Sequence, residues 1–179
     1  MTLRLVTASA FTALLLSGCA VTIGPSTAPA SGEPAAARTW TYELVDSATR
    51  PAGATSARIK GTADTYANST SLWVGCEGVA DEVVLATDGR YQRLVGHLGL
   101  RDDAPAGLVV HTLVSVDGRP VQNVQLDSDD PSAVEVNVVL TGVQQVTFQS
   151  QAVAGQCSPS DDSYAVLGEI YRIPSSELQ

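Results

Sequence analysis

The stretch 108–126, LVVHTLVSVDGRPVQNVQL, carries the strongest strand signal in the chain. Its first half, Leu108–Val116, is a mostly apolar run that ends at the pair Asp117-Gly118. Asp-Gly is favoured in two-residue hairpin turns, because both central positions of such a turn need a positive φ. The segment Val121–Leu126 can return beside the first half, so the stretch predicts a β-hairpin.

Strand signals recur on both sides of this hairpin. Apolar residues occupy every second position in three further segments, which are 93–100, 134–140 and 146–149. A period of two is typical of strands with one face on a core. A second Asp-Gly pair, Asp88-Gly89, joins Glu82–Thr87 to a strand that begins at Tyr91, and predicts a similar hairpin. Many short strands with frequent turns predict an all-β fold, and the length favours a β-sandwich.

The N-terminus has the form of an export signal. Met1–Arg4 holds one positive charge, and Leu5–Leu16 is a mostly apolar run. That run is shorter than the roughly 20 apolar residues of a membrane-spanning helix, but it fits the centre of a signal peptide. Leu16-Ser17-Gly18-Cys19 resembles the lipobox of bacterial lipoproteins. The resemblance implies a signal peptide over residues 1–18 and a diacylglycerol on Cys19; the alternative is an ordinary secretory signal before an unrelated cysteine.

Residues 19–38 predict a lipidated, flexible tether. After Cys19 this segment consists largely of Pro, Ala, Ser, Thr and Gly, with almost no large apolar residue. Such a segment cannot bury enough surface to offset the entropy lost on ordering. We therefore expect residues 39–179 to form one domain, which a lipid holds to the extracytoplasmic face of the cell membrane.

Composition limits the size of this domain and the nature of its partners. About 140 residues suffice for one domain with a core, but not for two. The formal net charge is −9, and it becomes more negative by one unit when Arg4 leaves with the signal peptide. An acidic domain is a poor partner for nucleic acid and for anionic lipid headgroups. Neither is expected to bind.

The three cysteines fit an oxidising compartment. If Cys19 carries lipid, Cys76 and Cys157 remain as a pair where disulfides persist. Closing a loop of this length would stabilise the fold by roughly 4 kcal/mol in the chain-entropy model. A metal site or a reactive thiol is the alternative, but a metal site favours closely spaced Cys or His ligands. The sequence therefore favours a disulfide.

Short motifs follow one another in a distinctive order between Trp40 and Ile173. They are Tyr66–Cys76, Asp88–Leu94, Gly96–Asp103, Val116–Gly118, Val134–Val143 and Leu167–Glu169. This order resembles the NPCBM family of carbohydrate-binding modules, which are often attached to glycoside hydrolases. The resemblance covers nearly the whole domain. It implies a jelly-roll β-sandwich of the galactose-binding-like type that binds carbohydrate without catalysis.

Two segments depart from the pattern of that family. Ser71–Val74 replaces a Gly-Thr-His stretch, and Tyr164–Glu169 replaces an Asp-His-Ala-Asp-Trp type of segment. If these segments shape the sugar site, the chain has lost it. Two functions therefore stay open: a module that binds an envelope or extracellular glycan, and a protein-interaction or structural module of the cell envelope.

Trp73 is the first candidate for a carbohydrate-binding residue. If its two neighbours in the chain face the core, the indole points outward, where a flat ring can stack on the apolar face of a sugar. Tyr66 and Tyr91 are further candidates for the same reason. The alternative for Trp73 is a structural ring, covered by the N-terminal segment of the domain or packed against Trp40.

Catalytic sites and cofactors are not expected. The chain has no nucleophile elbow, and His97 and His111 fall in strand patterns where an exposed side chain is the simpler explanation. Acidic residues gather in the expected loops, at Asp102-Asp103, Asp127–Asp130 and Asp161-Asp162. Solvated turns are the default interpretation of these loops. A structural calcium ion, held by carboxylate oxygens, is the alternative.

Overall fold

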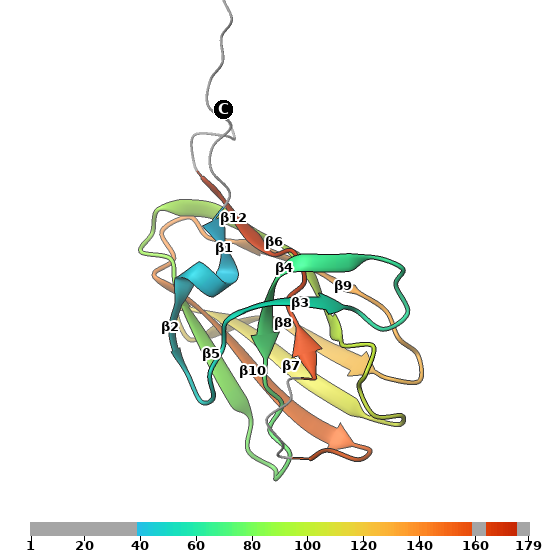
Figure 1. Ribbon diagram of the computed structural model, residues 1–179. Coiled ribbons are helices and arrows are strands. Elements are labelled where there is room, and N and C mark those ends of the chain that lie inside the picture. The colour runs from blue at the N-terminus through green and yellow to red at the C-terminus, as the bar shows by residue number, and fades with distance from the viewer. Residues whose placement is uncertain (1–38, 159–163, 175–179) are drawn as a thin grey trace, which may run out of the picture. The chain divides into compact units, whose positions relative to one another are not determined.

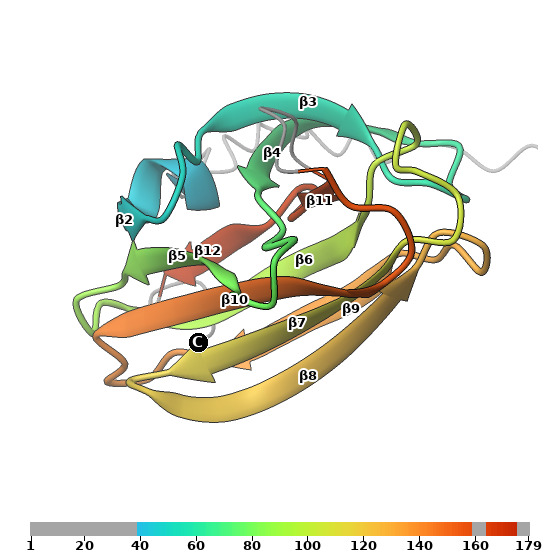
Figure 2. The ribbon, with the colours of Figure 1, turned by 90° about the horizontal axis from the view of Figure 1, so that it is seen from below.

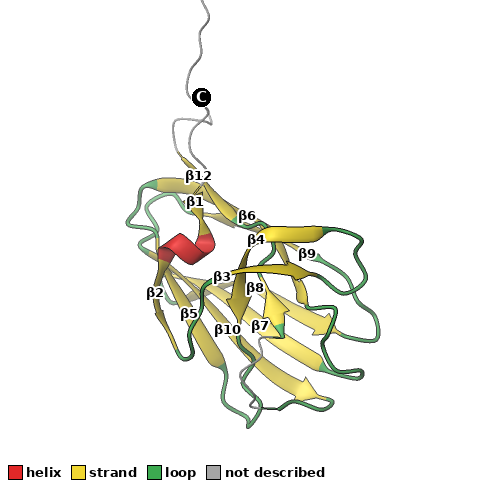
Figure 3. Cartoon of the chain, in the orientation of Figure 1, coloured by secondary structure: helices red, strands yellow, loops and turns green. Residues whose placement is uncertain are grey.

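The computed structural model describes residues 39–158 and 164–174. The predicted signal peptide, the tether with Cys19, and Asp161-Asp162 lie outside the described residues. Within the described ranges the chain is nearly all β-strand, and it has no helix long and apolar enough to cross a membrane (Figure 3). The all-β prediction is confirmed.

Twelve strands and one 3-10 helix succeed one another along the described part of the chain. In order they are β1 (Thr39–Trp40), η1 (Thr41–Leu44), β2 (Val45–Ala48), β3 (Ala54–Arg58), β4 (Thr65–Leu72), β5 (Asp81–Ala86), β6 (Tyr91–Leu100), β7 (Val109–Val116), β8 (Arg119–Asp127), β9 (Val134–Val139), β10 (Gln145–Ala154), β11 (Ala165–Val166) and β12 (Tyr171–Pro174). Ten of these strands have four to ten residues, which is ordinary for strands, whereas β1 and β11 have two residues each.

The strands form two antiparallel sheets that face one another (Figures 1 and 2). The seven-stranded sheet has the order β1-β12-β6-β11-β4-β3, and β9 also pairs with β6. The five-stranded sheet has the order β2-β5-β10-β7-β8. Strands that are distant in sequence are therefore neighbours in both sheets. The arrangement is a β-sandwich, as the alternating segments predicted.

The core lies between the sheets and uses the residues that the alternation assigned to it. In β9, Val136 and Val138 are buried, whereas Val139 is 59% exposed. In β10, Val146 and Phe148 are buried, and Phe148 is the largest of the fully buried side chains. Each such side chain contributes about 1.5–3 kcal/mol through burial. The period of two thus specifies which face of each strand is apolar.

Two glycines in the motif Gly96–Asp103 permit close packing on β6. A Cβ atom on Gly96 would lie 2.6 Å from the Cα of Ile170, and one on Gly99 would overlap the side chain of Ile59. Both isoleucines are fully buried. Glycine at these positions therefore lets neighbouring segments approach the backbone of the strand.

The two Asp-Gly pairs have different outcomes. Asp117-Gly118 joins β7 to β8, which pair along their length, so that hairpin is confirmed. Asp88-Gly89 also forms a tight turn, but β5 pairs with β2 and β10, whereas β6 belongs to the other sheet. The prediction of a second hairpin was wrong, because this turn carries the chain from one sheet to the other. Local turn chemistry does not determine which strand a returning chain will pair with.

A disulfide joins Cys76 to Cys157, with 5.4 Å between their Cα atoms. The predicted pairing is confirmed. Beside it, the N–H of Gly75 donates to the carbonyl of Ser150 at 3.0 Å, and the N–H of Ala152 donates to the carbonyl of Gly75 at 2.9 Å. The bridge and these two hydrogen bonds fasten the segment after β4 to the second half of β10.

Candidate functional site

Trp73 points away from the core, as predicted. Its neighbours Leu72 and Val74 are each 1% exposed, whereas Trp73 itself is partly buried. The indole N–H donates to the carbonyl of Pro51 at 2.5 Å, and the guanidinium carbon of Arg50 lies over the ring, 4.7 Å from its centroid. Arg50 therefore covers one face of the indole. Its role in sugar binding stays a prediction that depends on the other face.

Arg50 is itself held in place. Its Nε donates to Oδ2 of Asp81 at 3.0 Å, and Nη2 donates to the carbonyl of Val74 at 3.0 Å and also pairs with Asp81. Asp81 is 9% exposed, so this ion pair is shielded from solvent more than a surface pair is. The cation over Trp73 is thus a fixed part of the structure. The ring contact of Trp40 is with Tyr171, which it meets edge-on at 6.0 Å between ring centroids.

The two tyrosine candidates lie in other surroundings. Tyr66 is 9% exposed and belongs to a small apolar cluster with Ala57, Ile59 and Val166. Such a ring is part of the core and offers little surface to a ligand. Tyr91 is partly exposed, but the guanidinium of Arg172 lies 3.3 Å from its ring centroid.

The three aromatic candidates do not form one site. β11 lies between β4 and β6 and pairs with both. Across it, Leu72 of β4, which is next to Trp73, lies at the same height in the sheet as Leu100 of β6. Tyr91 lies at the opposite end of β6 from Leu100, and nine residues of strand span about 30 Å. Trp73 and Tyr91 therefore lie far apart, and they cannot contact the same sugar ring.

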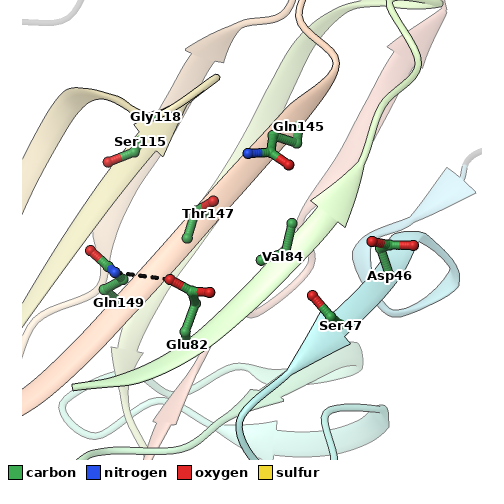
Figure 4. Close-up of a pocket in the computed structure, with 9 residues that line it drawn as sticks. All are labelled: Asp46, Ser47, Glu82, Val84, Ser115, Gly118, Gln145, Thr147 and Gln149. Carbon is green, nitrogen blue, oxygen red and sulfur yellow. Dashed lines mark hydrogen bonds between the residues drawn. The ribbon is translucent and has the colours of Figure 1, made fainter. Parts of the chain in front are cut away.

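A hollow lies on the outer face of the five-stranded sheet, the face turned away from the core. Its volume is about 440 Å³, within the range of about 300–1,000 Å³ for ligand sites. It is lined by Asp46, Ser47, Glu82, Val84, Ser115, Gly118, Gln145, Thr147 and Gln149. Figure 4 shows these residues on β2, β5, β10 and β7 and in the turn after β7.

A second hollow of about 250 Å³ adjoins the first, and Gln149 lines both. Its other lining residues are Ala80, His111, Leu113, Asn123 and Gln151. We call the two hollows together the outer groove. The groove extends across strands rather than along one, because its lining comes from all five strands of the sheet.

The strand registers place the lining residues side by side. Gln149 lies opposite Glu82 on β5 and opposite Leu113 on β7, and Leu113 lies opposite Asn123 on β8. The side-chain amide of Gln149 donates to Oε2 of Glu82 at 2.9 Å. Glutamine offers both a donor and an acceptor, so this row can exchange hydrogen bonds with a hydroxyl-rich ligand.

The sequence analysis did not single out these residues. They are the polar members of alternating segments, which on sequence alone are indistinguishable from solvated positions. The only available signal was the repetition of Gln at 145, 149 and 151 on one face of a strand. These residues form a groove only because five strands that are far apart in sequence lie side by side in one sheet.

Of the two histidines, His111 lines the second hollow, and the loop acids Asp127 and Asp129 accept backbone hydrogen bonds. His97 and His111 are exposed on strands, as predicted. Asp129 accepts a hydrogen bond from the N–H of Gly107 at 3.0 Å, and Asp127 accepts one from the N–H of Asp129 at 2.9 Å. In the described ranges no group of three or more His, Cys, Asp or Glu side chains is arranged to hold a metal ion. These carboxylates therefore act as turn acceptors.

Comparison with known proteins gives structural matches alone. No protein-family model and no curated protein sequence matches the chain. Among solved structures, CBM51-2 with GlcNAc and INT domains from Clostridium perfringens ZmpB matches with a TM-score of 0.58 at 14% identity, over 78% of this chain and 32% of that one. CBM51 from Clostridium perfringens GH95, solved with methyl-galactose, matches with a TM-score of 0.57 at 13% identity, over 76% of this chain and 100% of that one.

The chain has the fold of the CBM51 modules. The match covers the whole of the GH95 module, but the chain spans only 32% and 15% of two ZmpB structures, the second of which includes the M60 catalytic domain. A CBM51-like fold confirms the sandwich of a carbohydrate-binding module that the motif order predicted. At 13–14% identity the likeness concerns the fold, and the ligand must be argued from the residues of this chain.

Proposed function

We propose that this protein is a lipoprotein, anchored to the membrane through Cys19, whose sandwich domain binds a glycan on the extracytoplasmic side without catalysing a reaction. The observation that carries the proposal is the CBM51-like fold, which matches the full length of a module solved with methyl-galactose. The outer groove supports it, since its polar lining suits a ligand rich in hydroxyl groups.

A binding role fits the groove better than hydrolysis does. Glycoside hydrolysis uses a pair of carboxyl groups that flank the scissile bond on either side of the sugar. In the groove, Asp46 is exposed, and Glu82 is half-buried and accepts a hydrogen bond from the amide of Gln149 on Oε2. Both side chains lie in a lining of amides and hydroxyls, and they are suited to accept hydrogen bonds from a ligand.

Trp73 is a second candidate contact for the same glycan function. A sugar ring could stack on the face of the indole that Arg50 does not cover, and the loss of that contact would cost about 1–3 kcal/mol of binding free energy. Titration calorimetry with wild type and Trp73→Ala tests this role. An unfolded variant, seen by circular dichroism, would show instead that the ring is structural.

A glycan array with the purified full-length protein, run with and without calcium, tests the proposed function directly. We expect binding to at least one glycan, and no turnover of that glycan during incubation. If the array shows no binding and the protein captures an envelope protein instead, the interaction-module hypothesis replaces this one. Calcium dependence would support the alternative in which loop carboxylates hold an ion.

The membrane anchor is tested separately at Cys19. Replacing Cys19 with Ser should abolish labelling by a radioactive or clickable fatty acid and release the protein from the membrane fraction, because the thiol is the attachment point. A Cys76→Ser variant is the matched control, since its thiol lies in the disulfide. Membrane association of the Cys19→Ser protein would contradict the lipoprotein proposal.

A further inference from the structure

We infer that the outer groove binds the interior of a neutral glycan chain, which lies across the strands of the five-stranded sheet. This inference rests on the proposed function and assigns a site and a ligand class to it. It differs from a site at Trp73, because Trp73 is not among the residues that line the groove.

The length of the groove indicates a chain rather than a single sugar. Its lining begins at Asp46 on β2 and reaches Asn123 on β8, the two edge strands of the sheet. Neighbouring strands lie about 4.8 Å apart, so four intervals span about 19 Å. This distance exceeds the width of one sugar ring. A ligand that fills the groove must therefore have several rings in a row.

The chemistry of the lining fits hydroxyl groups. Gln145, Gln149 and Gln151 project from β10, the central strand of the sheet, and each amide can both donate and accept. A sugar hydroxyl has the same dual capacity. The hydrogen bond from Gln149 to Glu82 orients the amide before a ligand arrives, which lowers the entropy cost of binding.

The charge of the lining selects against anionic chains. Among the described residues that line the groove, Asp46 and Glu82 are carboxylates, His111 is the one imidazole, and no Lys or Arg is present. A uronic acid, sulfate or phosphate group would meet the two carboxylates with no Lys or Arg to compensate its charge. The whole protein adds to this effect with its net charge of −9. A neutral glycan has no such penalty.

The lining also argues against a protein partner in the groove. Val84 and Leu113 are the larger apolar residues of the lining, and the strongly exposed valines of the described chain are elsewhere, at Val79, Val121, Val139 and Val153. The buried centre of a protein interface is normally rich in aromatic and aliphatic side chains. The groove therefore suits a polar chain better than the side chains of another protein.

The test is titration calorimetry of the purified full-length protein with oligosaccharides of one to six units. Neutral series of galactose, glucose and N-acetylglucosamine are compared with oligogalacturonates as the anionic series. We expect the affinity for at least one neutral series to increase with chain length up to three or four units, and the anionic series not to bind. Equal affinity for the monosaccharide and the longer chains would overturn the inference in favour of recognition at a chain end.

Substitutions locate the site. Gln149→Ala and Gln145→Ala should each weaken binding about three- to tenfold, the loss expected for one hydrogen bond. Asn137→Ala is the matched control, because Asn137 is an exposed strand amide on β9, in the other sheet. Wild-type affinity in both glutamine variants, together with a loss in Trp73→Ala, would overturn the groove but keep the proposed function. If wild type binds none of the neutral series, this inference fails, and the glycan array decides whether the proposed function fails with it.

Discussion

The two Asp-Gly turns of this protein have similar φ angles, but they lead the chain into different sheets. Asp88 and Gly89 have φ values of 52° and 67°, and Asp117 and Gly118 have 45° and 75°. Both are tight turns of the kind that Asp-Gly favours. After Asp117-Gly118 the chain pairs with the strand it has just left, whereas after Asp88-Gly89 it enters the other sheet.

The surroundings of the two turns explain this difference. The N–H groups of Thr87 and Gly89 donate to the carbonyls of Gln144 and Val143, each at 2.8 Å, and Leu140 donates to Gln92 at 2.6 Å. Residues 140–144 are the connection from β9 to β10, which also passes between the sheets. We call the turn at Asp88-Gly89 the first crossing between the sheets and residues 140–144 the second crossing. The first crossing is thus bonded to the second. The hairpin turn receives fewer such contacts and lies beside the edge strand β8.

This comparison shows that a turn motif specifies a reversal of the chain, but it does not specify the strand with which the returning chain pairs. β5 is already paired with β10, and β6 with β9, so the packing of distant strands determines the sheet that each one joins. The two crossings stabilise one another through backbone hydrogen bonds. We therefore expect substitutions at the crossings to cost more than equivalent changes at the hairpin.

The largest effect is expected for apolar side chains. Leu140→Ala removes a fully buried side chain at the second crossing and should lower the free energy of unfolding by about 2–5 kcal/mol. Val121→Ala, in the hairpin strand β8 where the side chain is 50% exposed, should change it by less than about 0.5 kcal/mol. Urea denaturation measures both values. Equal losses would remove the distinction between the two regions.

A smaller effect is expected at the hydroxyl that joins the two crossings. Oγ1 of Thr87 donates to the carbonyl of Val143 at 2.6 Å, and Thr87 is fully buried. Thr87→Val keeps the shape and removes this hydrogen bond, while the carbonyl of Val143 keeps the bond from the N–H of Gly89, so the change should cost about 0.5–1.5 kcal/mol. Thr141→Val is the control, because Thr141 is exposed. A stability in Thr87→Val equal to that of wild type would show that this hydrogen bond does not hold the crossings together.

The two turn aspartates are an expected exception to this order, because the side chain of Asp117 in the hairpin turn bonds to the connection from β9 to β10. Oδ1 of Asp117 accepts hydrogen bonds from the N–H groups of Gln144 and Gln145, both at 3.0 Å. Asp88 pairs with Arg90 at the surface. Alanine at either position has the same positive-φ cost, so Asp117→Ala should be less stable than Asp88→Ala by about 1 kcal/mol. Thermal unfolding of the two variants, side by side, gives this difference, and the reverse order would contradict it.

A change of the opposite sign is expected at Arg172, whose guanidinium lies over the ring of Tyr91, the first residue of β6. Burial lowers the pKa of Arg172 from its usual value to about 10, because desolvation disfavours its charge. The unfolded chain therefore holds this proton more tightly than the folded protein does. The stability decreases as the pH falls from the usual pKa of arginine to about 10, and the penalty is complete at neutral pH. Nε and Nη1 have no hydrogen-bond partner among the described residues.

Arg172→Met should therefore leave the stability at pH 7 unchanged or raise it by up to about 2 kcal/mol, since it removes a desolvated charge and keeps an apolar stem. The melting temperature of wild type and variant at pH 7 measures this. A loss of more than about 2 kcal/mol would show that the contact with Tyr91 outweighs the cost of burying the cation.

Much of the fold could be predicted from local patterns. The alternation in β9 and β10 identified buried residues such as Val136 and Phe148, and Cys76 and Cys157 were paired correctly by elimination. The candidate site was less predictable. Trp73 does point outward, but the cation over its ring comes from Arg50, and nothing in the spacing of these two residues indicates their contact.

The sequence by itself determined the strand class, the apolar face of each strand, the tight turns and the disulfide, because these depend on neighbouring residues or on the chemistry of single residue types. Only the tertiary structure decided which strands are neighbours. That arrangement depends on the simultaneous burial of many apolar faces, which no local segment encodes. The outer groove is a product of this assembly, since Glu82, Gln149 and Asn123 become neighbours only when β5, β10, β7 and β8 share one sheet.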